Sequence, residues 1–470
     1  MEAGSTSSVA PERAPLPRKA SAPASAHGLA SVPPPGGLPM ADVSGLSLSW
    51  FACALLALLA ASLWLVLSPG LLAGGHSAPA TVGWVHCLVL GFLATTTFGA
   101  VYQLLPVVVG EPLAHPRLPW LHLPLHGLGC LGLIHSFASA NYLAVALSGG
   151  LLLLGFALFA LNSLRTFARA RRKDVVAYAF CAATLWLLLA AAAGLLAALN
   201  RQHGFLPQPT PVWLRLHAHL GLLGFFVTLL QGAGFRLLPM FTLGEVRNWD
   251  RVVLALALTQ GGLLGLSIGW LEDLAAGRIV FAALICAGLL LSALEARALL
   301  ASRRKRALDQ GLQAFIVGGV ALGLAAPLGF LLLATDWFDG ALEGRVPLLY
   351  GLLVVGGALL PMVCGMLLKV FPFLVWMRAY APRLGRGPVP LASQLPSPVL
   401  EQAWLETHLL ALVLLALGFS RTEAFWLPAG ALVLLLSQLL LLSNFVRIAL
   451  HLRTPRPVPG PGPAPVKARN

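Results

Sequence analysis

The stretch HCLVLGFLATTTFGAVYQLLP at residues 86–106 returns in altered form as HLGLLGFFVTLLQGAGFRLLP at residues 219–239. Aligned without a gap, the two stretches are identical at ten of 21 positions, including the histidine, a Gly-Phe pair, a Gly-Ala pair and the final Leu-Leu-Pro. A third stretch, LLVVGGALLPMVCGMLLKVFP from residue 352, keeps two glycines and the proline but begins with leucine. The offsets are equal (219 − 86 = 133 and 352 − 219 = 133), which predicts a threefold internal repeat.

The rest of the chain has the composition of a membrane protein. It has 470 residues, of which 58% are hydrophobic and 10% charged, whereas soluble domains carry about 25% charged residues. Apolar runs of about 20 residues predict membrane-spanning helices. We predict an all-α polytopic fold with twelve transmembrane helices in three pseudo-threefold repeats of four, at residues 46–174, 175–307 and 308–450. The predicted spans are 46–68, 80–109, 118–139, 141–165, 175–198, 212–241, 251–271, 277–300, 312–335, 346–376, 402–420 and 424–450.

Basic residues orient these spans. If both termini face the cytoplasm, the inside segments carry 24 Lys and Arg and the outside segments five, with Arg236 and Lys369 inside helices. This asymmetry follows the positive-inside rule and predicts cytoplasmic termini. The net charge of +14 therefore belongs to helix ends, and we expect no nucleic-acid partner. The composition fits a bacterial inner membrane.

Both ends of the chain lack a folding pattern. Residues 1–45 are rich in Ser, Ala, Pro and Gly, and residues 451–470 are rich in Pro, so we expect two disordered cytoplasmic tails without a cleavable signal. The six cysteines all lie in apolar runs and form no CxxC motif, which is typical of small buried residues.

Three sets of four helices, with His86 near the outer end of the second helix and a histidine on the sixth, resemble the haem-copper oxidase subunit I superfamily. The segment HAHLGLLGF at residues 217–225 and the pattern from residue 86 are most similar to divergent cytochrome c oxidase subunit I-like and nitric oxide reductase-like membrane proteins. The resemblance covers residues 46–450. It implies twelve core helices in three arcs of four.

The resemblance also implies ligand positions. His86 matches a low-spin haem ligand, and either His217 or His219 matches the copper ligand of the sixth helix. The family's histidines on the seventh and tenth helices have no counterpart: the seventh helix has no histidine, and the tenth reads Tyr350-Gly351-Leu352. We therefore expect incomplete haem and copper sites and no full terminal oxidase activity.

The outer histidines leave three interpretations open. Two facing imidazoles, His86 with His219 or His217, could hold a b-type haem, since no cysteine lies in a CxxCH motif. They could instead form an inter-helix hydrogen bond, or a labile copper site. His217 and His219 lie two residues apart and point about 200° apart on a helix, so they cannot easily share one metal. His135 is a candidate third outer ligand.

Other polar residues lie within the predicted helices. His122 and His126 share a helix face, which suits either a metal or a polar stripe along a water-filled channel. His408 follows Glu406 near a helix start, as a proton relay or as an interfacial pair. Arg236 and Lys369 occupy one repeated position, where they either extend to the membrane interface or serve a proton or ion role.

Two classes of function follow. The first is a haem b protein with an electron-transfer or oxygen- or nitric oxide-related role, with copper not expected. Its partners would be the bilayer and other respiratory-chain subunits or a cytochrome. The second is a non-enzymatic membrane protein on the same scaffold, serving oxidase assembly, haem or copper handling, or solute transport.

Overall fold

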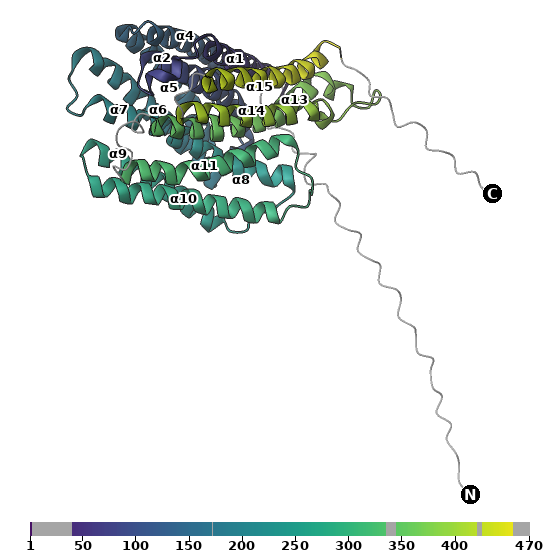
Figure 1. The fold of residues 1–470 in the computed structure, drawn as a ribbon. Helices are drawn as coiled ribbons and strands as arrows, with labels where there is room; N and C mark the ends of the chain where they lie inside the picture. The colour runs from purple at the N-terminus through teal and green to yellow at the C-terminus, as the bar shows by residue number, and fades with distance from the viewer. Residues whose placement is uncertain (2–39, 172, 335–344, 421–424, 455–470) are drawn as a thin grey trace. The chain divides into compact units, whose positions relative to one another are not determined.

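A computed structural model of the chain describes residue 1 and residues 40–171, 173–334, 345–420 and 425–454, and the predicted tails lie largely outside this part. The described chain is helical (Figure 1). Its α-helices are α1 (Met40–Leu67), α2 (Pro79–His86), α3 (Thr95–Val109), α4 (Leu118–Ala138), α5 (Tyr142–Arg169), α6 (Val175–His203), α7 (Thr210–His219), α8 (Thr228–Thr242), α9 (Trp249–Leu271), α10 (Ala275–Ala301), α11 (Gln310–Ala334), α12 (Val346–Gly351), α13 (Leu360–Ala379), α14 (Pro398–Ser420) and α15 (Trp426–Ala449). Short 3₁₀ helices are η1 (Leu71–Gly74), η6 (Ala381–Arg383), η7 (Ala392–Gln394) and η8 (Leu450–Leu452).

Three π-helical segments join neighbouring α-helices into long continuous spans. They are η2 (Cys87–Ala94) between α2 and α3, η3 (Leu220–Val227) between α7 and α8, and η5 (Leu352–Leu359) between α12 and α13. In each joined span, 72%, 67% and 72% of the most apolar 18-residue stretch is buried inside the protein. The corresponding share is 56% or less in every other candidate span of the described chain. These three helices therefore form the interior, and they contain the three stretches that carry the sequence pattern.

In each π segment, where N–H groups bond one residue further back than in an α-helix, one backbone carbonyl also accepts a side-chain hydrogen bond. The Leu90 carbonyl accepts from the Thr95 hydroxyl (2.8 Å), and the Leu223 carbonyl accepts from the Thr228 hydroxyl (3.2 Å). The Gly356 carbonyl accepts from Nε2 of His408 (2.9 Å). These carbonyls are 133 residues apart (223 − 90 = 133 and 356 − 223 = 133). Each of the three central helices therefore has, at the equivalent position, a backbone carbonyl that accepts a side-chain hydrogen bond.

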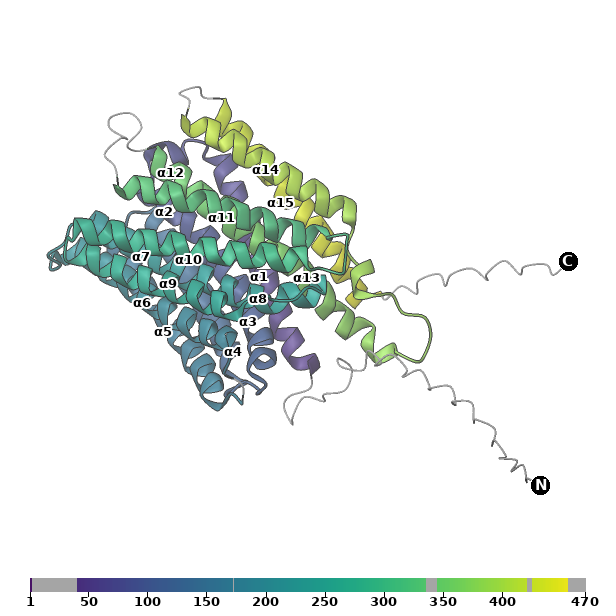
Figure 2. The same ribbon diagram turned by 90° about the horizontal axis from the view of Figure 1, so that it is seen from below.

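The peripheral helices pack as antiparallel neighbours of the central ones. Extensive contacts join α4 to α5, α9 to α10 and α14 to α15, and α1 packs on α3 and on α15, so the two ends of the described chain meet. The long helices lie side by side as a bundle in Figure 1, and the view from below in Figure 2 shows that α14 is inclined to α10 and α11.

The helical membrane fold is confirmed, and the helix limits lie close to the predicted spans. Eleven helices of the described chain are long and apolar enough to cross a membrane. The remaining predicted span, residues 118–139, forms α4, but this helix is not among the eleven. Its 21 residues include His122, His126 and His135, and polar residues of this kind lower its apolar character.

Replacing Gly262 with alanine should destabilise the packing of α9 on α10. A Cβ atom there would stand 2.8 Å from the Phe281 carbonyl oxygen and 2.9 Å from the Ile285 nitrogen, and backbone atoms cannot move aside easily. Overpacking of this kind costs about 1–3 kcal/mol. Thermal unfolding in detergent should show a lower midpoint. The control is Gly261→Ala, since a Cβ at the adjacent Gly261 meets open space. Equal midpoints for the two variants would contradict the packing argument.

Candidate functional site at the outer histidines

His86 and His217 form the closest pair among the predicted outer ligands. Their rings are nearly parallel, with an interplanar angle of 15° and centroids 6.0 Å apart. Each histidine is the last or nearly the last residue before a π segment, His86 directly before η2 and His217 three residues before η3. Two imidazoles that bind one metal ion from opposite sides at roughly 2.0 Å have centroids about 6 Å apart. The centroid spacing of the pair is therefore compatible with a shared metal ion.

The hydrogen bonds of the His86 and His217 imidazoles determine which ring nitrogen carries the proton and which keeps a lone pair. Nδ1 of His86 lies 2.7 Å from the Val82 carbonyl oxygen, and Nδ1 of His217 lies 2.8 Å from the Ala190 carbonyl oxygen. A carbonyl oxygen only accepts, so each Nδ1 carries the proton. Each Nε2 then keeps its lone pair. Histidines that bind metals in proteins are oriented in this way by a second hydrogen bond.

Glycine on a neighbouring helix makes room for His217. A Cβ on Gly194 of α6 would lie 2.7 Å from Cε1 of His217 and 2.8 Å from its Nδ1. The His217 ring thus lies directly on the backbone of α6, where Ala190 also provides the carbonyl that it bonds. On the other side of the pair, Phe137 of α4 stacks on His86 with centroids 5.1 Å apart.

His219 points to a different set of neighbours. Its Nδ1 donates to the Arg215 carbonyl (2.8 Å), and its Nε2 lies 3.4 Å from the Tyr350 hydroxyl of α12. Trp270 of α9 packs edge-on against the same ring, with centroids 4.9 Å apart. The structure therefore separates the two neighbouring histidines, His217 toward His86 and His219 toward Tyr350.

His122 and His126 of α4 are packed among aromatic side chains of α1, α3 and α5. Both are almost fully buried, with 0% and 2% exposure. His122 Nδ1 lies 2.9 Å from the Tyr102 hydroxyl, and His126 Nε2 lies 2.9 Å from Oγ1 of Thr95. The Thr95 hydroxyl already donates to the Leu90 carbonyl, so His126 donates to Thr95 through Nε2.

The rings of His122 and His126 differ in how their Nε2 atoms are bonded. Nε2 of His126 is occupied by its hydrogen bond, whereas Nε2 of His122 has no hydrogen-bond partner among the described residues. Trp50 and Phe98 pack against His122, each with a centroid distance of 4.8 Å. Aromatic side chains enclose both imidazoles, and a metal or a water-filled channel at His122 and His126 stays a prediction.

The structure separates the predicted pair of His408 and Glu406. His408 is fully buried and bonds the Gly356 carbonyl, while the Glu406 side chain is on the surface and accepts from Gln402 (2.8 Å). The buried acid of α14 is instead Glu401, which lies near Nδ2 of Asn444 (3.5 Å). The sequence analysis did not single out Glu401.

Lys369 ends in an ion pair with Asp309, which directly precedes α11. Lys305 also reaches the Asp309 carboxylate, at 3.2 Å. Burial by itself would raise the pKa of Asp309, but the hydrogen bond and charge of Lys369, with help from the Leu312 amide and Lys305, hold that pKa below its ordinary value. Asp309 is therefore charged in the folded protein down to a lower pH than in the unfolded chain.

Replacing Lys369 with methionine should weaken the protein and change its response to acid. A depressed pKa contributes stability that is present above the unfolded pKa of about 4 and is lost as the pH falls through the lower folded value. Without Lys369 this contribution disappears, so the unfolding midpoint at pH 7 should fall. The variant should also lose less stability between pH 7 and pH 3 than the parent, because the acid-sensitive contribution of Asp309 is no longer there to be lost. The measurement is a thermal unfolding series between pH 7 and pH 3.

The matched control for that series is Lys305→Met. Lys305 is the more exposed and more distant of the two partners of Asp309, with 45% exposure against 17% for Lys369. Its loss should have the smaller effect. If the unfolding midpoint of the Lys369 variant falls with decreasing pH as it does in the parent, the ion pair does not set the pKa of Asp309.

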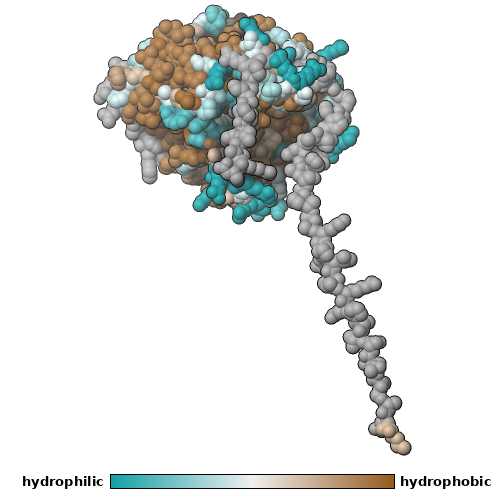
Figure 3. All heavy atoms as spheres, turned by 90° about the vertical axis from the view of Figure 1, so that its right-hand side faces the viewer, coloured by the Kyte–Doolittle hydropathy of each residue, from teal (hydrophilic) through white to brown (hydrophobic). Residues whose placement is uncertain are grey.

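Arg236 is the other predicted intrahelical cation, and it pairs with Asp174, the N-cap residue of α6. Both side chains are about two-fifths exposed. Figure 3 faces the end of the bundle where α1 begins and α13 ends, and hydrophilic residues form separate patches there among hydrophobic ones. Whether Arg236 and Lys369 have a further role stays a prediction.

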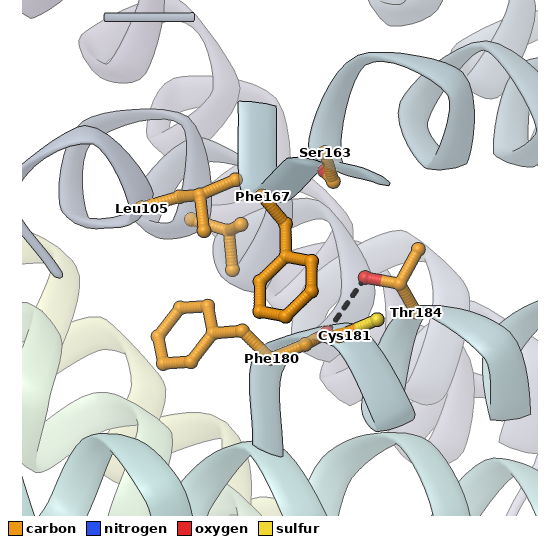
Figure 4. A pocket seen from close by; sticks show the side chains of 7 residues that line it. Leu105, Ser163, Phe167, Phe180, Cys181 and Thr184 are labelled. Carbon is orange, nitrogen blue, oxygen red and sulfur yellow. Dashed lines mark hydrogen bonds between the residues drawn. The ribbon is translucent and has the colours of Figure 1, made fainter. Parts of the chain in front are cut away.

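A small cavity lies within the helix bundle. A cavity of about 10 Å³ lies between α3, α5 and α6, lined among others by Leu105, Ser163, Phe180 and Thr184 (Figure 4). This volume holds about one water molecule. Among the described residues, no three His, Cys, Asp or Glu side chains form a group that could hold a metal ion. Any metal at the outer pair would therefore have two protein ligands from this part of the chain.

His135 does not join the outer pair, since it is exposed near the end of α4. The sequence analysis did not predict three contacts of these histidines, those of Tyr350 with His219, Tyr102 with His122 and Thr95 with His126. Only Thr95 gave a signal, because it matches Thr228 in the aligned stretches.

Comparison with known proteins supports the fold. No family model matches this sequence, and no curated protein sequence matches it. A heme-copper terminal oxidase, solved as a dimer by cryo-electron microscopy, matches the structure with a TM-score of 0.65. The match covers 87% of this chain and 84% of that chain at 12% sequence identity.

The chain therefore has the fold of a heme-copper terminal oxidase. The likeness concerns the fold alone, since the two sequences share only 12% identity.

Proposed function

We propose that this protein binds one b-type haem between His86 and His217 and uses it for electron transfer or for an oxygen- or nitric oxide-related role. The observation that carries the proposal is the geometry of the two rings, which lie 6.0 Å apart and nearly parallel. Both present a free Nε2, because each Nδ1 donates to a backbone carbonyl. The scaffold supports the same proposal, since the structurally similar protein is a heme-copper terminal oxidase.

The donor set fits a haem that would be held by the imidazoles of His86 and His217. Neutral imidazole is a common ligand of haem iron, and no cysteine motif for covalent attachment is present. A bound b-type haem would supply reversible one-electron chemistry. The chain's own contribution would be to hold the two rings in the required tautomer through the carbonyls of Val82 and Ala190, and to shield the site from water with Phe137 and neighbouring apolar residues.

The proposal does not extend to full terminal oxidase activity. His219, the other candidate on the same helix, is held by Tyr350 and Trp270. Tyr350 and Leu352 stand on the tenth predicted helix, where the resemblance would require histidines. Copper is therefore not proposed as a resident metal.

The test is an absorption spectrum of the purified protein. Protein from haem-replete cells should show a sharp b-type α-band in the dithionite-reduced minus oxidised difference spectrum. His86→Ala should lose the band, because one axial ligand is gone. A colourless parent protein, purified under the same conditions and correctly folded, would overturn the proposal.

A second candidate is a non-enzymatic membrane protein on the same scaffold, acting in oxidase assembly, haem or copper handling, or solute transport. The observation that favours it is the closed cluster of His219, Tyr350 and Trp270, in which side chains contact one another directly. A deletion strain separates the assembly version of this candidate. Lost oxidase assembly, together with a haem-free purified protein, would support it, and normal respiration would count against it.

We also propose that the fold is built from three repeats of four helices with both termini on the cytoplasmic side of a bacterial inner membrane. The three π segments support the repeat, because the bonded carbonyls of Leu90, Leu223 and Gly356 lie 133 residues apart. The excess of basic residues on one side supports the orientation. The proposed domain limits are a tail at 1–45, a membrane domain at 46–450 and a tail at 451–470. Other respiratory-chain subunits or a cytochrome are the proposed partners.

A further inference from the structure

A pocket opens at the end of α8, far along the helix from His219. Its volume is about 370 Å³, and its lining includes Phe235, Arg236, Pro239, Glu245, Val246 and Trp249. The pocket lies between two candidate membrane spans, Thr210–Thr242 and Trp249–Leu271, so it sits at the boundary between hydrocarbon and water. A volume of this size is enough for a small polar group.

The pocket is preformed, because its loop is fixed to α10. The amide of Glu245 donates to the Ser302 hydroxyl (3.1 Å). A Cβ on Gly244 would lie 2.7 Å from the Leu299 carbonyl oxygen, so the loop backbone packs directly on α10. Leu243 adopts a left-handed conformation with φ of 55°, which turns the chain out of α8. A rigid loop between α8 and α9 holds the charged groups of the pocket in position before a ligand binds.

The charges of the pocket are of both signs. Arg236 provides a guanidinium with five N–H donors, and Asp174 accepts from one of its nitrogens. Glu245 is exposed, and it belongs to none of the six ion pairs found among the described residues. Trp249 offers the face of an indole ring, which attracts cations. A ligand that carries one anion and one cation a few bonds apart would match these three residues.

Apolar side chains around the pocket face outward. Met240 is 55% exposed, Leu243 59%, Trp249 46% and Val253 50%. Side chains of this type at a membrane boundary contact lipid tails, and tryptophan is enriched there. The surroundings therefore suit a molecule with a polar head and an apolar tail.

We propose that this pocket binds the headgroup of phosphatidylethanolamine from the adjacent leaflet. The lipid phosphate accepts hydrogen bonds from Arg236, the primary ammonium donates to Glu245 and lies against Trp249, and the acyl chains extend over Met240 and Leu243. A primary ammonium suits Glu245 better than a quaternary one, because only the primary group donates hydrogen bonds. This site is independent of any group bound at His86.

Native mass spectrometry of the delipidated full-length protein in detergent tests the proposal. The protein is incubated with equal amounts of phosphatidylethanolamine, phosphatidylglycerol or phosphatidylcholine of identical acyl chains. We expect phosphatidylethanolamine to be retained most strongly. Glu245→Gln should reduce its retention about tenfold, since a charged hydrogen bond is lost. Trp249→Leu should also reduce it, and Glu245→Lys should shift the preference to phosphatidylglycerol.

The matched controls are Glu272→Gln and Trp120→Leu, which alter exposed residues of the same types elsewhere. Neither should change lipid retention. Equal retention of phosphatidylethanolamine in the Glu245 variants and the controls would overturn the proposal. Retention of phosphatidylglycerol as strong as that of phosphatidylethanolamine in the parent protein would also overturn it.

Soluble glycerophosphoethanolamine distinguishes a lipid from a free metabolite with the same headgroup. It should compete poorly with the lipid, because it lacks the acyl chains that would cover Met240 and Leu243. Competition at equal concentration would mean that the pocket takes a soluble ligand, and the assignment to a lipid would fall.

Discussion

His217→Ala should abolish the haem spectrum of the purified protein, whereas His219→Ala should leave most of it. The two residues lie on one helix turn, yet only His217 faces His86, with ring centroids 6.0 Å apart. His219 instead contacts Tyr350 and Trp270. Loss of groups that merely orient a metal ligand costs about 10–100-fold in affinity, so loss of the ligand itself should cost at least as much. Haem content per protein, measured by a pyridine haemochrome assay, is the readout.

Gly194→Val provides an independent test of the same pair. A Cβ at residue 194 would stand 2.7 Å from the His217 ring, so valine should displace that ring without removing any ligand. We expect lower haem content with a preserved helical circular dichroism spectrum. The control is Gly150→Val, since a Cβ on Gly150 meets open space. If His219→Ala loses the haem and His217→Ala keeps it, the assignment of the ligands is wrong.

Replacing Glu295 with leucine should produce the largest loss of stability. Glu295 lies on α10 and is fully buried, and its carboxylate accepts from the backbone amides of Arg247 (2.6 Å) and Asn248 (3.0 Å). It also accepts from Nη1 of Arg251 (3.0 Å). Leucine would leave two backbone donors and one guanidinium without their acceptor. Removing one partner of a buried pair costs about 3–5 kcal/mol, and the partial exposure of Arg251 favours the lower end.

The measurement for Glu295 is the thermal unfolding midpoint in detergent, with Glu295→Gln as a graded variant. Glutamine keeps one carbonyl oxygen for the backbone amides but presents an amide donor to Arg251, so its effect should be intermediate. Glu272→Leu, at an exposed acid just after α9, should change the midpoint little. A Glu295→Leu variant as stable as the parent would show that the loop before α9 does not depend on this carboxylate.

Much of the fold could be predicted from the sequence, because hydrocarbon-length apolar runs allow few alternatives to helices. The predicted span 80–109 became Pro79–Val109, and 212–241 became Thr210–Thr242. The π segments inside them could not be predicted. Apolar periodicity does not distinguish an N–H group that bonds four residues back from one that bonds five back, and contacts with other helices are not visible in the sequence. The bond from His408 of α14 to Gly356 is an example.

The candidate site was predicted only in part for the same reason. Helix geometry indicated that His217 and His219 point in different directions, but it could not say which of them faces His86. That outcome depends on Gly194, which lies on another helix and leaves room for one ring. The expected neighbours Glu406 and His408 separate, because two residues along a helix turn a side chain about 200°, from the buried side to the surface.

Each π segment allows the two halves of its central helix to be rotated about the helix axis independently of each other. One residue inserted into an α-helix turns everything beyond it by about 100° and advances it by about 1.5 Å. A π turn absorbs such an insertion locally, so the half of the helix that ends at His86 and the half that carries Tyr102 can be set separately. Deleting one residue within η2 would couple the two halves again, and either the His86 ring or the Tyr102 hydroxyl would turn away from its partner.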